Sequence, residues 1–457
     1  MRALPFDAVS QPKVRAVIVN YDGGAMTLDC LRSLVNSDWP ADRLEIVLVD
    51  NASIDGVIWE VRDQYPAVTV IESLTNEGFA RGCNMGIGDL GGVDYVALLN
   101  NDAVCAPTWI RQLVETLEAD PTLGAACGKI LLTERRLGVR LDVLAPEFED
   151  QRPRADERLV RLSGVRIEGC SVWDAAGFSE GVHPAEAGDR LEPQFRWLKR
   201  SADVYVAPSF AGDAPFATLE LRLMADVDTK VRLRTPSGEQ EIVVRDWPEW
   251  VAVRVPTRPV DIVNSAGSEL VEGGFGHDRG FREMDFGQYD EPADVFAWCG
   301  GAVVLRGDYL RQVGTFDPRF FLYYEDTELS WRGQLAGWRY RYVPDAVVRH
   351  RHAASTVEGS DIFRFWVERN RLLMLTKVAP APVAKHAWKV HFADTVRTGQ
   401  AELERLRRRR AGTRDATTKL RSLTSAAVAA PLMLVDRVRL GVSRSERDSI
   451  LRWQVPR

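Results

Sequence analysis

The first third of the chain alternates short apolar runs with segments of helical periodicity. The apolar runs are rich in β-branched residues and predict strands at 14–20, 44–50, 68–73, 95–99 and 127–132. The segments between them repeat apolar residues at helical spacing and predict helices at 26–36, 57–64, 79–90 and 109–119. Strands that alternate with helices are typical of parallel strands with crossover helices, so the pattern predicts an α/β fold.

The pattern changes after Thr133. Residues 134–161 are dense in charge, and the segments that follow alternate apolar and polar positions between short turns. These segments predict strands at 217–223, 230–234, 241–245 and 250–255. Strands of this period and spacing favour an antiparallel β insert, which we expect to be a small sandwich.

The α/β pattern then resumes. We expect a strand within 295–305, a helix at 326–336 and a strand at 339–348. From Asp361 onward the chain is amphipathic and predicted to be helical, with an inward face made by Trp366, Leu372, Leu373 and Leu375.

These changes divide the 457-residue chain, which is 45% apolar and long enough for about three globular units. The predicted segments are an α/β half at 14–133, a β-rich insert at 134–260, a second α/β half at 261–360 and a basic helical region at 361–457.

Charge is spread unevenly along the chain. The net charge is −6, yet residues 401–457 hold 14 Lys and Arg against 6 Asp and Glu. A basic tail beside the apolar stretch 426–435 suits either a solvated or oligomer-forming helix, or a helix lying on anionic lipid headgroups. Nucleic acid is the less favoured partner.

Compartment signals are few. The six cysteines show no C-x-x-C spacing, which favours free thiols in a reducing compartment. The first 13 residues lack the apolar core of a secretory signal, and no stretch reaches 18 apolar residues. We therefore predict a cytoplasmic protein, with a peripheral position on the inner face of the membrane as the open alternative.

Two acidic clusters carry the candidate chemistry. Residues 100–102, Asn-Asn-Asp, follow the buried run 95–99, so Asp102 is expected at the carboxyl edge of the sheet, where α/β folds bind ligands and a carboxylate can hold a metal. Its alternative role is to cap the helix that begins near Pro107. Glu325 and Asp326 follow an aromatic run and open a predicted helix, whose dipole favours acids in the first turn.

Other polar residues cluster after the predicted strands. Asp50 ends one strand, while Asn76, Arg81 and Asn84 follow the next among glycines that let a ligand approach the backbone. The sequence has no G-x-x-x-x-G-K-[ST] and no G-x-G-x-x-G, so ordinary loop chemistry remains an alternative.

Two histidines, His350 and His352, alternate along the end of a predicted strand. Either is a candidate ligand for a metal or a phosphate, and a surface histidine is the plain alternative.

Seven blocks in order resemble the family 2 glycosyltransferases of the GT-A fold, especially rhamnosyltransferase-like members of bacterial envelope polysaccharide assembly. The resemblance covers about 14–133 and 261–375. The blocks are Val-Ile-Val-Asn-Tyr (17–21), Val-Asp-Asn-Ala-Ser (49–53), Asn-Glu-Gly-Phe-Ala (76–80), Leu-Asn-Asn-Asp (99–102), Gly-Gly-Ala-Val-Val-Leu-Arg (300–306), Gly-Thr-Phe-Asp (314–317) and Phe-Leu-Tyr-Tyr-Glu-Asp-Thr-Glu-Leu-Ser-Trp-Arg (321–332).

The resemblance implies a mixed sheet with helices on both faces and a role for many of these residues. It maps the metal-binding D-x-D motif onto Asn100, Asn101 and Asp102, with an amide in place of the first acid, and implies a divalent metal, Mg or Mn. The residues implied to lie at or near the nucleoside are Asn20, Tyr21, Asp50, Arg81 and Asn84. The same resemblance implies that Asp326 of the Glu325–Asp326 pair is the catalytic base and that His350 or His352 completes the metal or diphosphate site.

From these residues we expect an inverting transfer of a sugar, with rhamnose as the first hypothesis, from a nucleoside diphosphate sugar to a glycan or lipid-linked acceptor. Gly300 and Gly301 would let the backbone approach the substrate, and Trp298 and Trp331 are candidates to stack on a sugar, with a core role as their alternative. Competing hypotheses are a noncatalytic glycan-binding scaffold and a nucleotidyltransferase. The β insert lies outside the family pattern.

Overall fold

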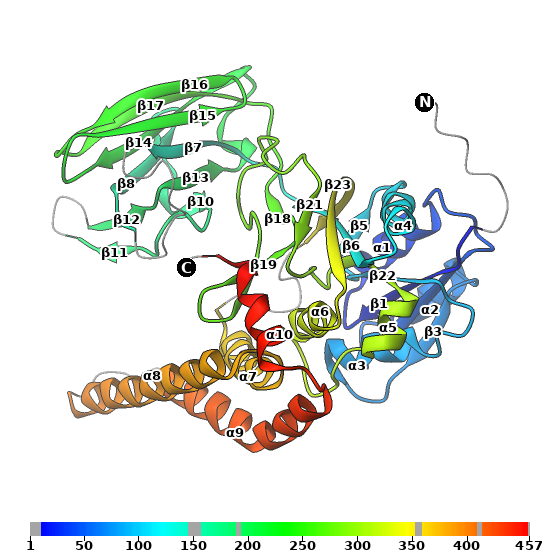
Figure 1. Cartoon of the computed structure of the whole chain (residues 1–457). Coiled ribbons are helices and arrows are strands. Elements are labelled where there is room, and N and C mark those ends of the chain that lie inside the picture. Colours follow the sequence, from blue (N-terminus) through cyan, green and yellow to red (C-terminus); the bar gives the residue numbers. More distant parts are fainter. Residues whose placement is uncertain (1–10, 145–156, 189–192, 352–358, 409–413, 456–457) are drawn as a thin grey trace. The chain divides into compact units, whose positions relative to one another are not determined.

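The computed structural model describes residues 11–144, 157–188, 193–351, 359–408 and 414–455 (Figure 1). The chain divides into two compact units. The first, called here the α/β unit, consists of 1–129, 267–277 and 292–454; the second, called the β unit, consists of 130–266, 278–291 and 455–457. The helical C-terminal region is thus part of the α/β unit.

The central sheet of the α/β unit is mixed, and its main path runs β21-β23-β6-β22-β4-β1-β2-β3, with β5 paired to β23. Its strands are β1 (Val14–Asn20), β2 (Leu44–Asp50), β3 (Thr69–Glu72), β4 (Tyr95–Leu99), β5 (Ala103–Cys105), β6 (Leu123–Leu132), β21 (Ala293–Val295), β22 (Ala302–Arg306) and β23 (Arg339–His350). Strands β1, β2, β3 and β4 pair in parallel, as the alternation of strands and helices predicts, whereas β22 runs antiparallel to both β4 and β6.

The helices of this unit have the bounds α1 (Ala25–Val35), α2 (Val57–Gln64), α3 (Gly78–Ile87), α4 (Trp109–Ala119), α5 (Gly307–Val313), α6 (Glu325–Leu335), α7 (Asp361–Val378), α8 (Ala381–Arg407), α9 (Asp415–Arg439) and α10 (Arg444–Ser449). Helix α4 shows why such segments fold: it buries Trp109, Leu113 and Leu117 on one stripe. Helix α7 begins where the Ser360 hydroxyl accepts a hydrogen bond from the Phe363 N–H. Its Leu372, Leu373 and Leu375 are buried, as predicted.

The apolar run at 295–305 does not form one strand. Strand β21 ends at Val295, and β22 begins only at Ala302. Residues 296–301 between them turn through Cys299, Gly300 and Gly301, because two adjacent glycines favour a turn over a strand. This break places the two glycines directly before β22, whose Ala302 pairs with Leu99 at the end of β4.

The β unit is a sandwich. One sheet runs β10-β13-β7-β15-β16 and the other β11-β12-β8-β14-β17, with β9 on β8. The strands are β7 (Leu137–Leu144), β8 (Val160–Ile167), β9 (Cys170–Ser171), β10 (Gly177–Phe178), β11 (Glu186–Ala187), β12 (Gln194–Leu198), β13 (Ser201–Val206), β14 (Phe216–Met224), β15 (Thr229–Thr235), β16 (Gly238–Val244) and β17 (Glu249–Pro256). Short strands elsewhere are β18 (Val263–Ser265), β19 (Ser268–Val271), β20 (Phe275–Asp278) and β24 (Gln454–Val455).

The alternating pattern of the insert explains its core. Leu219, Leu221 and Leu223 of β14 point inward, and the residues between them point outward. Strand β7 was missed by the sequence analysis because it starts inside the charge-dense segment, yet it alternates in the same way and buries Val139 and Leu141. The cysteines Cys30, Cys83, Cys105, Cys127, Cys170 and Cys299 are all free.

Candidate functional site

The carboxyl ends of three parallel strands define the candidate site. In the parallel register of β1 and β2, Asn20 lies beside Asp50, and β4 on the other side of β1 leads into residues 100–102. Asn20, Asp50 and Asp102 therefore lie along one edge of the sheet, as the strand pattern predicts.

Asn20 is the hydrogen-bonding centre of this edge. Its side chain is fully buried, and its Nδ2 donates to Asp50 Oδ1 at 3.2 Å and to Ser53 Oγ at 3.0 Å. Its Oδ1 accepts from Asn101 Nδ2 at 3.0 Å. Because both amide protons are used within the protein, Asn20 orients Asp50 and Asn101, while the adjacent Tyr21 is 45% exposed and accessible to a ligand.

A second amide, Asn51, was missed by the sequence analysis. Its Nδ2 donates to Asn76 Oδ1 at 3.0 Å, and its Oδ1 accepts from the Glu77 N–H at 2.8 Å. The loop that Asn51 holds continues into Phe79, whose N–H donates to the carbonyl of Phe321 at 2.7 Å. The available signal was the position of Asn51 directly after the strand-end acid.

Arg81 and Asn84, on helix α3, have partners within the protein. Arg81 Nη1 lies 2.9 Å from Glu77 Oε2, and its side chain is 53% exposed. Asn84 binds the backbone of Phe316 through both of its polar atoms, donating from Nδ2 to the carbonyl at 2.8 Å and accepting at Oδ1 from the N–H at 3.0 Å. Its position is structural, and ligand binding by either residue stays a prediction.

The acidic pair opens α6 after a strained turn. Tyr323 and Tyr324 both have φ near 69°, a left-handed conformation that is uncommon for residues other than glycine. Asn370 of α7, fully buried, donates from Nδ2 to the carbonyls of Leu322 and Tyr323, each at 2.9 Å. Asn370 thus supports the turn that delivers the acids, and the sequence analysis missed it because its partners are distant in sequence.

Residues 300 and 301 connect the two acidic clusters. The N–H of Gly300 donates to Asp326 Oδ2 at 3.0 Å, and the carbonyl of Gly301 accepts from the Asn100 N–H at 2.9 Å. A Cβ at residue 300 would lie 3.3 Å from the Phe79 ring and 3.5 Å from Asp326 Cβ, so the backbone lies close to both. The turn therefore holds Asp326 and the 100–102 segment at one place.

Asp102 and His350 come together from opposite ends of the sequence. Strand β5 pairs with β23 in a register that sets His350 beside Ala103, and His350 Nε2 lies 3.0 Å from Asp102 Oδ1. Asn100 Nδ2 is 3.3 Å from the same ring nitrogen. His352 lies outside the described residues.

This pair has the chemistry of a partial metal site. A carboxylate oxygen and an imidazole nitrogen are both ligands for divalent ions, and only 9% and 11% of the two side chains is exposed. Within the described ranges, no group of three or more His, Cys, Asp or Glu side chains could hold a metal by itself. The residues fit an ion whose remaining ligands come from a diphosphate and water.

Burial sets the protonation of the acidic pair. Burial raises the pKa of Asp326, partly offset by hydrogen bonds from the N–H groups of Gly300 and Thr327. Burial also raises the pKa of Glu325 well above its usual value, and the adjacent Asp326 charge raises it further. Among the described residues, Glu325 Oε2 has no hydrogen-bond partner.

The stacking role expected of Trp331 is wrong for this structure. Its side chain is 0% exposed and packs edge-on against Phe296, with ring centroids 5.4 Å apart. Trp298 is equally buried. Neither indole has a free face to offer a sugar, so the core alternative holds for both.

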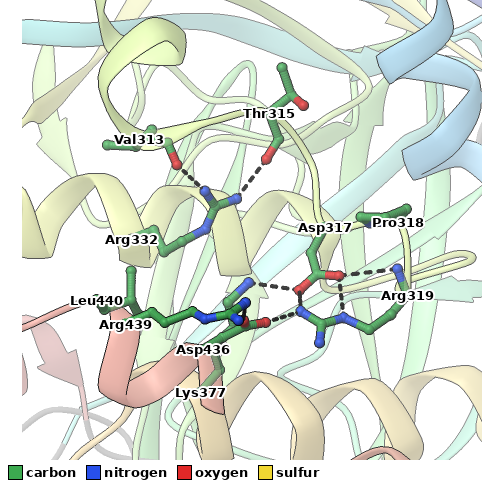
Figure 2. A pocket seen from close by; sticks show the side chains of 10 residues that line it. All are labelled: Val313, Thr315, Asp317, Pro318, Arg319, Arg332, Lys377, Asp436, Arg439 and Leu440. Atoms are coloured by element: carbon green, nitrogen blue, oxygen red, sulfur yellow. Dashed lines mark hydrogen bonds and ion pairs between the residues drawn. The ribbon is translucent and has the colours of Figure 1, made fainter. Parts of the chain in front are cut away.

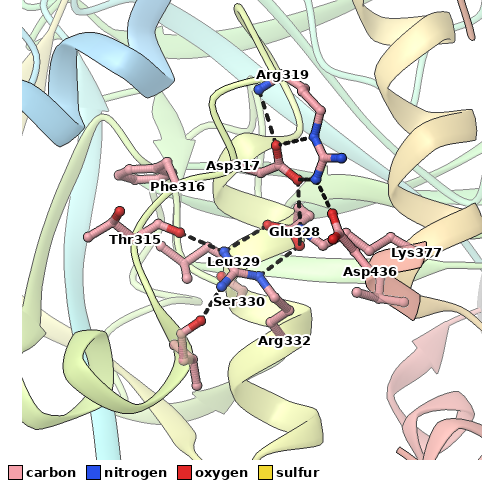
Figure 3. A network of polar contacts seen from close by, with 12 residues as sticks. Thr315, Phe316, Asp317, Arg319, Glu328, Leu329, Ser330, Arg332, Lys377 and Asp436 are labelled. Carbon is pink, nitrogen blue, oxygen red and sulfur yellow. Dashed lines mark hydrogen bonds and ion pairs between the residues drawn. The ribbon is translucent and has the colours of Figure 1, made fainter. Parts of the chain in front are cut away.

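A dense ionic network surrounds Glu328 and Arg332, which follow the acidic pair on α6, and is called the charge cluster here (Figure 3). Lys377 Nζ lies 2.7 Å from Asp317 Oδ2 and 2.8 Å from Glu328 Oε1. Arg332 binds both oxygens of Glu328, at 2.8 and 3.0 Å. Arg319 pairs with Asp317 through two hydrogen bonds.

The charge cluster lines a cavity of about 500 Å³ (Figure 2). Arg319 also pairs with Asp436, near the end of α9, so α9 is attached to the loop before the acidic pair. Burial alone would raise the pKa of Asp317, but hydrogen bonds from Arg319 and the charge of Lys377 hold it well below its usual value. Each cation in Figure 3 already contacts a carboxylate, so the cluster is structural.

Two family models match the chain. The model described as Glycosyl transferase family 2 matches residues 16–157, and that described as Glycosyl transferase family group 2 matches residues 275–371. These ranges contain both acidic clusters.

Curated relatives match shorter segments. An N-acetylglucosaminyl-diphospho-decaprenol L-rhamnosyltransferase of Mycobacterium tuberculosis is 47% identical over 68 residues, 14% of this chain and 22% of that protein. An uncharacterized glycosyltransferase of Haemophilus influenzae is 24% identical over 132 residues, 28% of this chain and 40% of that protein. The chain therefore matches about a fifth of the length of the first relative.

Solved structures resemble it over a larger part of its length. A structure of GalNAc-T7 with UDP, GalNAc and Mn²⁺ covers 85% of this chain and 51% of its own, with 14% identity and a TM-score of 0.46. A mannosyltransferase from Pyrobaculum calidifontis in complex with GDP-Man and Mn²⁺ covers 96% of this chain and 88% of its own, with 16% identity and a TM-score of 0.40.

Proposed function

We propose that the chain transfers a sugar from a nucleoside diphosphate sugar to an acceptor hydroxyl, with inversion at the anomeric carbon. The two matched glycosyl transferase family models support the transfer. The observation that supports this most is the turn at residues 300 and 301, which binds Asp326 on one side and Asn100 on the other. A turn that holds both the base and the diphosphate site suits an inverting transfer, in which the acceptor displaces the diphosphate from the anomeric carbon in one step.

Asp326 acts as the base. Its Oδ2 accepts a hydrogen bond from the Gly300 N–H, and its Oδ1 accepts from both the N–H and the hydroxyl of Thr327. These bonds fix the carboxylate and leave a lone pair on Oδ2 for the proton. The acceptor hydroxyl gives its proton to this carboxylate as its oxygen attacks the anomeric carbon from the face opposite the diphosphate. The raised pKa of Asp326 makes it a stronger base than an ordinary aspartate.

The donor binds along the strand ends. Asp50, held by Asn20, and the exposed Tyr21 contact the nucleoside. Asp102 and His350 would hold a Mg²⁺ or Mn²⁺ ion, which supplies positive charge to the diphosphate leaving group when bound. Because that group leaves as a stabilised anion, no second catalytic acid is needed.

The test is donor binding and transfer with metal present and absent. Asp102→Ala should weaken binding of a nucleoside diphosphate in Mn²⁺ by about tenfold or more, and chelation by EDTA should make wild type and variant alike. Thermal shift with UDP, GDP and dTDP measures binding, since a ligand of the folded state raises its stability. Wild-type affinity that is unchanged by EDTA contradicts the metal role.

For the sugar and acceptor, we propose rhamnose and a glycan or lipid-linked glycan of the bacterial envelope. Support comes from the name of the Mycobacterium tuberculosis relative and from its 47% identity over the matched segment. Transfer assays with dTDP-rhamnose, then UDP-hexoses and UDP-galactofuranose, decide among donors. Turnover only with another donor overturns the rhamnose assignment while leaving sugar transfer in place.

We also propose that the C-terminal helices lie on anionic lipid. On α9, Arg421, Val428, Leu432, Val435 and Arg439 recur at helical spacing on one face, and Val428 is 82% exposed. No helix among the described residues is long and apolar enough to cross a bilayer.

The lipid proposal is tested by sedimentation with vesicles that contain an anionic lipid. Val428→Ser combined with Leu432→Ser should reduce sedimentation at low salt, and added salt should reduce it for the wild type as well. Point variants are better than truncation after about residue 400, because α9 carries Asp436, the partner of Arg319. Wild-type protein that stays in the supernatant at low salt contradicts lipid binding.

A further inference from the structure

The β unit carries an outer sheet face that its core does not use. In the sheet made by β12, β8, β14 and β17 (Figure 1), the inward residues belong to the sandwich core. Directly opposite residues on adjacent strands share a face, so the outward set can be traced through the register. The face formed by this set is called the outer face below.

Three rows of residues cross the outer face. In the strand register, Trp197 lies opposite Arg161, and Arg166 lies opposite Glu220. Arg222 lies between Gly164 on one neighbouring strand and Trp250 on the other. A fourth pair joins Thr218 to Arg254. The outer face therefore brings together four arginines and one glutamate, although the chain as a whole is acidic.

The arginines are held flat by aromatic rings. The Arg166 guanidinium lies 3.9 Å from the Trp250 ring centroid, and that of Arg161 lies 4.4 Å from Phe195. A third pair, Arg254 over Phe216, is 3.8 Å apart. Stacking fixes the guanidinium groups of Arg166 and Arg254 before an anion binds, so less entropy is lost when one does.

Gly164 makes room for one of these rings. A Cβ at this position would lie 2.7 Å from the Trp250 ring. The indole can therefore lie against β8 only because residue 164 is a glycine. Trp250 is 38% exposed in this position, and Arg254 on the same strand is exposed as well. The indole and the Arg166 guanidinium stacked on it thus place an apolar surface next to a fixed cation, which suits a sugar unit that bears an acidic group.

We infer that the outer face binds an anionic saccharide chain, in which carboxylate or phosphate groups pair with Arg166 and Arg254 and sugar rings pack on the part of Trp250 that Arg166 leaves exposed. The guanidinium groups of Arg166 and Arg254 select for negative charge, and the exposed ring selects for a saccharide over a simple polyanion. The inference is independent of the proposed sugar transfer, because all of these residues belong to the β unit.

Binding of full-length protein to three polymers tests the inference. Polygalacturonate carries both sugar and charge, dextran is a neutral saccharide, and polyglutamate is a polyanion without sugar. Titration calorimetry at moderate salt should find polygalacturonate bound at least about tenfold more tightly than either of the others. Equal binding of polyglutamate reduces the face to a nonspecific cationic surface and overturns the inference, as does failure to bind polygalacturonate.

Matched variants locate the binding. Trp250→Ala and, separately, Arg166→Gln should each weaken polygalacturonate binding by about tenfold. Trp247→Ala is the control, because Trp247 is 50% exposed and stacks on Arg245 in the turn between β16 and β17, outside the strands that form the outer face. Thermal melts check that each variant folds, and nucleotide binding should be unchanged in all of them. Loss of binding in the control, or retention in both face variants, rejects the assignment.

Discussion

Helix α6 places two kinds of buried carboxylate within one turn of each other. Glu328 is fully buried and paired with both Arg332 and Lys377, whereas Glu325 is nearly as buried and its Oε2 has no partner among the described residues. The same contrast separates Asp317, whose pKa is held low by cations, from Asp326, whose pKa burial raises. Paired carboxylates hold the structure together, while unpaired ones retain the capacity to take a proton.

This difference explains how the fold stays stable although two acids of the site are buried without a cation. Ionising a buried carboxylate without a cation costs free energy, and a site that needs such a base must recover stability elsewhere. The charge cluster includes Glu328 on the same helix as the pair, and it connects α6, α7 and α9 through Lys377 and Arg319.

The largest expected effect is on stability. Lys377→Met leaves Asp317 and Glu328 with one cation fewer in a buried setting, so the free energy of unfolding should fall by about 3–5 kcal/mol. Urea denaturation measures this. Arg32→Ala, which breaks the exposed pair with Asp29, is the control and should cost less than about 1 kcal/mol. Similar losses in both variants would mean that the cluster is no more important than a surface pair.

The next effect is on catalysis. Asp326→Asn keeps the shape and removes the base, so transfer should fall by about 10²-fold or more, while donor affinity and the thermal midpoint are retained. Asp317→Asn is its mirror image, with a lower midpoint and near-normal turnover by the folded protein. Steady-state kinetics and thermal melts of the two variants test the contrast, which is lost if Asp326→Asn turns over at the wild-type rate.

The smallest effect is on pH dependence. Because the pKa of Glu325 is raised in the folded state, the folded protein holds a proton that the unfolded chain releases above about pH 4. Glu325 should therefore make wild-type stability fall as pH rises from that point to its folded pKa, by up to about 1.4 kcal/mol per pH unit, and Glu325→Gln should remove this contribution.

Urea midpoints of wild type and Glu325→Gln from pH 5 to 8 measure the difference. Asp317 should change stability with pH in the opposite direction, because its pKa is lowered in the folded state. Its stabilisation is present above about pH 4 and is lost in acid. A wild type and a Glu325→Gln variant that stay parallel over this range would show that Glu325 ionises as an ordinary surface acid does.

Much of the fold could be predicted locally. The strands and helices of 14–132 lie close to their predicted positions because apolar periodicity and strand propensity are properties of neighbouring residues. Strand β7 was hidden by surrounding charge, and the run at 295–305 broke at adjacent glycines. In both places the composition and the apolar pattern indicate different structures: charge indicates a loop where β7 forms, and an apolar run indicates a strand where the glycines form a turn.

The candidate site was also predicted only in part from the sequence. The order of motifs along the sequence determined where a base, a metal ligand and a nucleoside edge would be sought, and His350 does lie beside Asp102. Only the tertiary structure decided that Trp331 is in the core, that Asn84 binds the Phe316 backbone and that Asn370 supports the strained turn. It also decided which acids acquired cations, because Lys377 and Glu328 meet through the packing of α7 on α6, and burial and pairing depend on neighbours that local sequence does not specify.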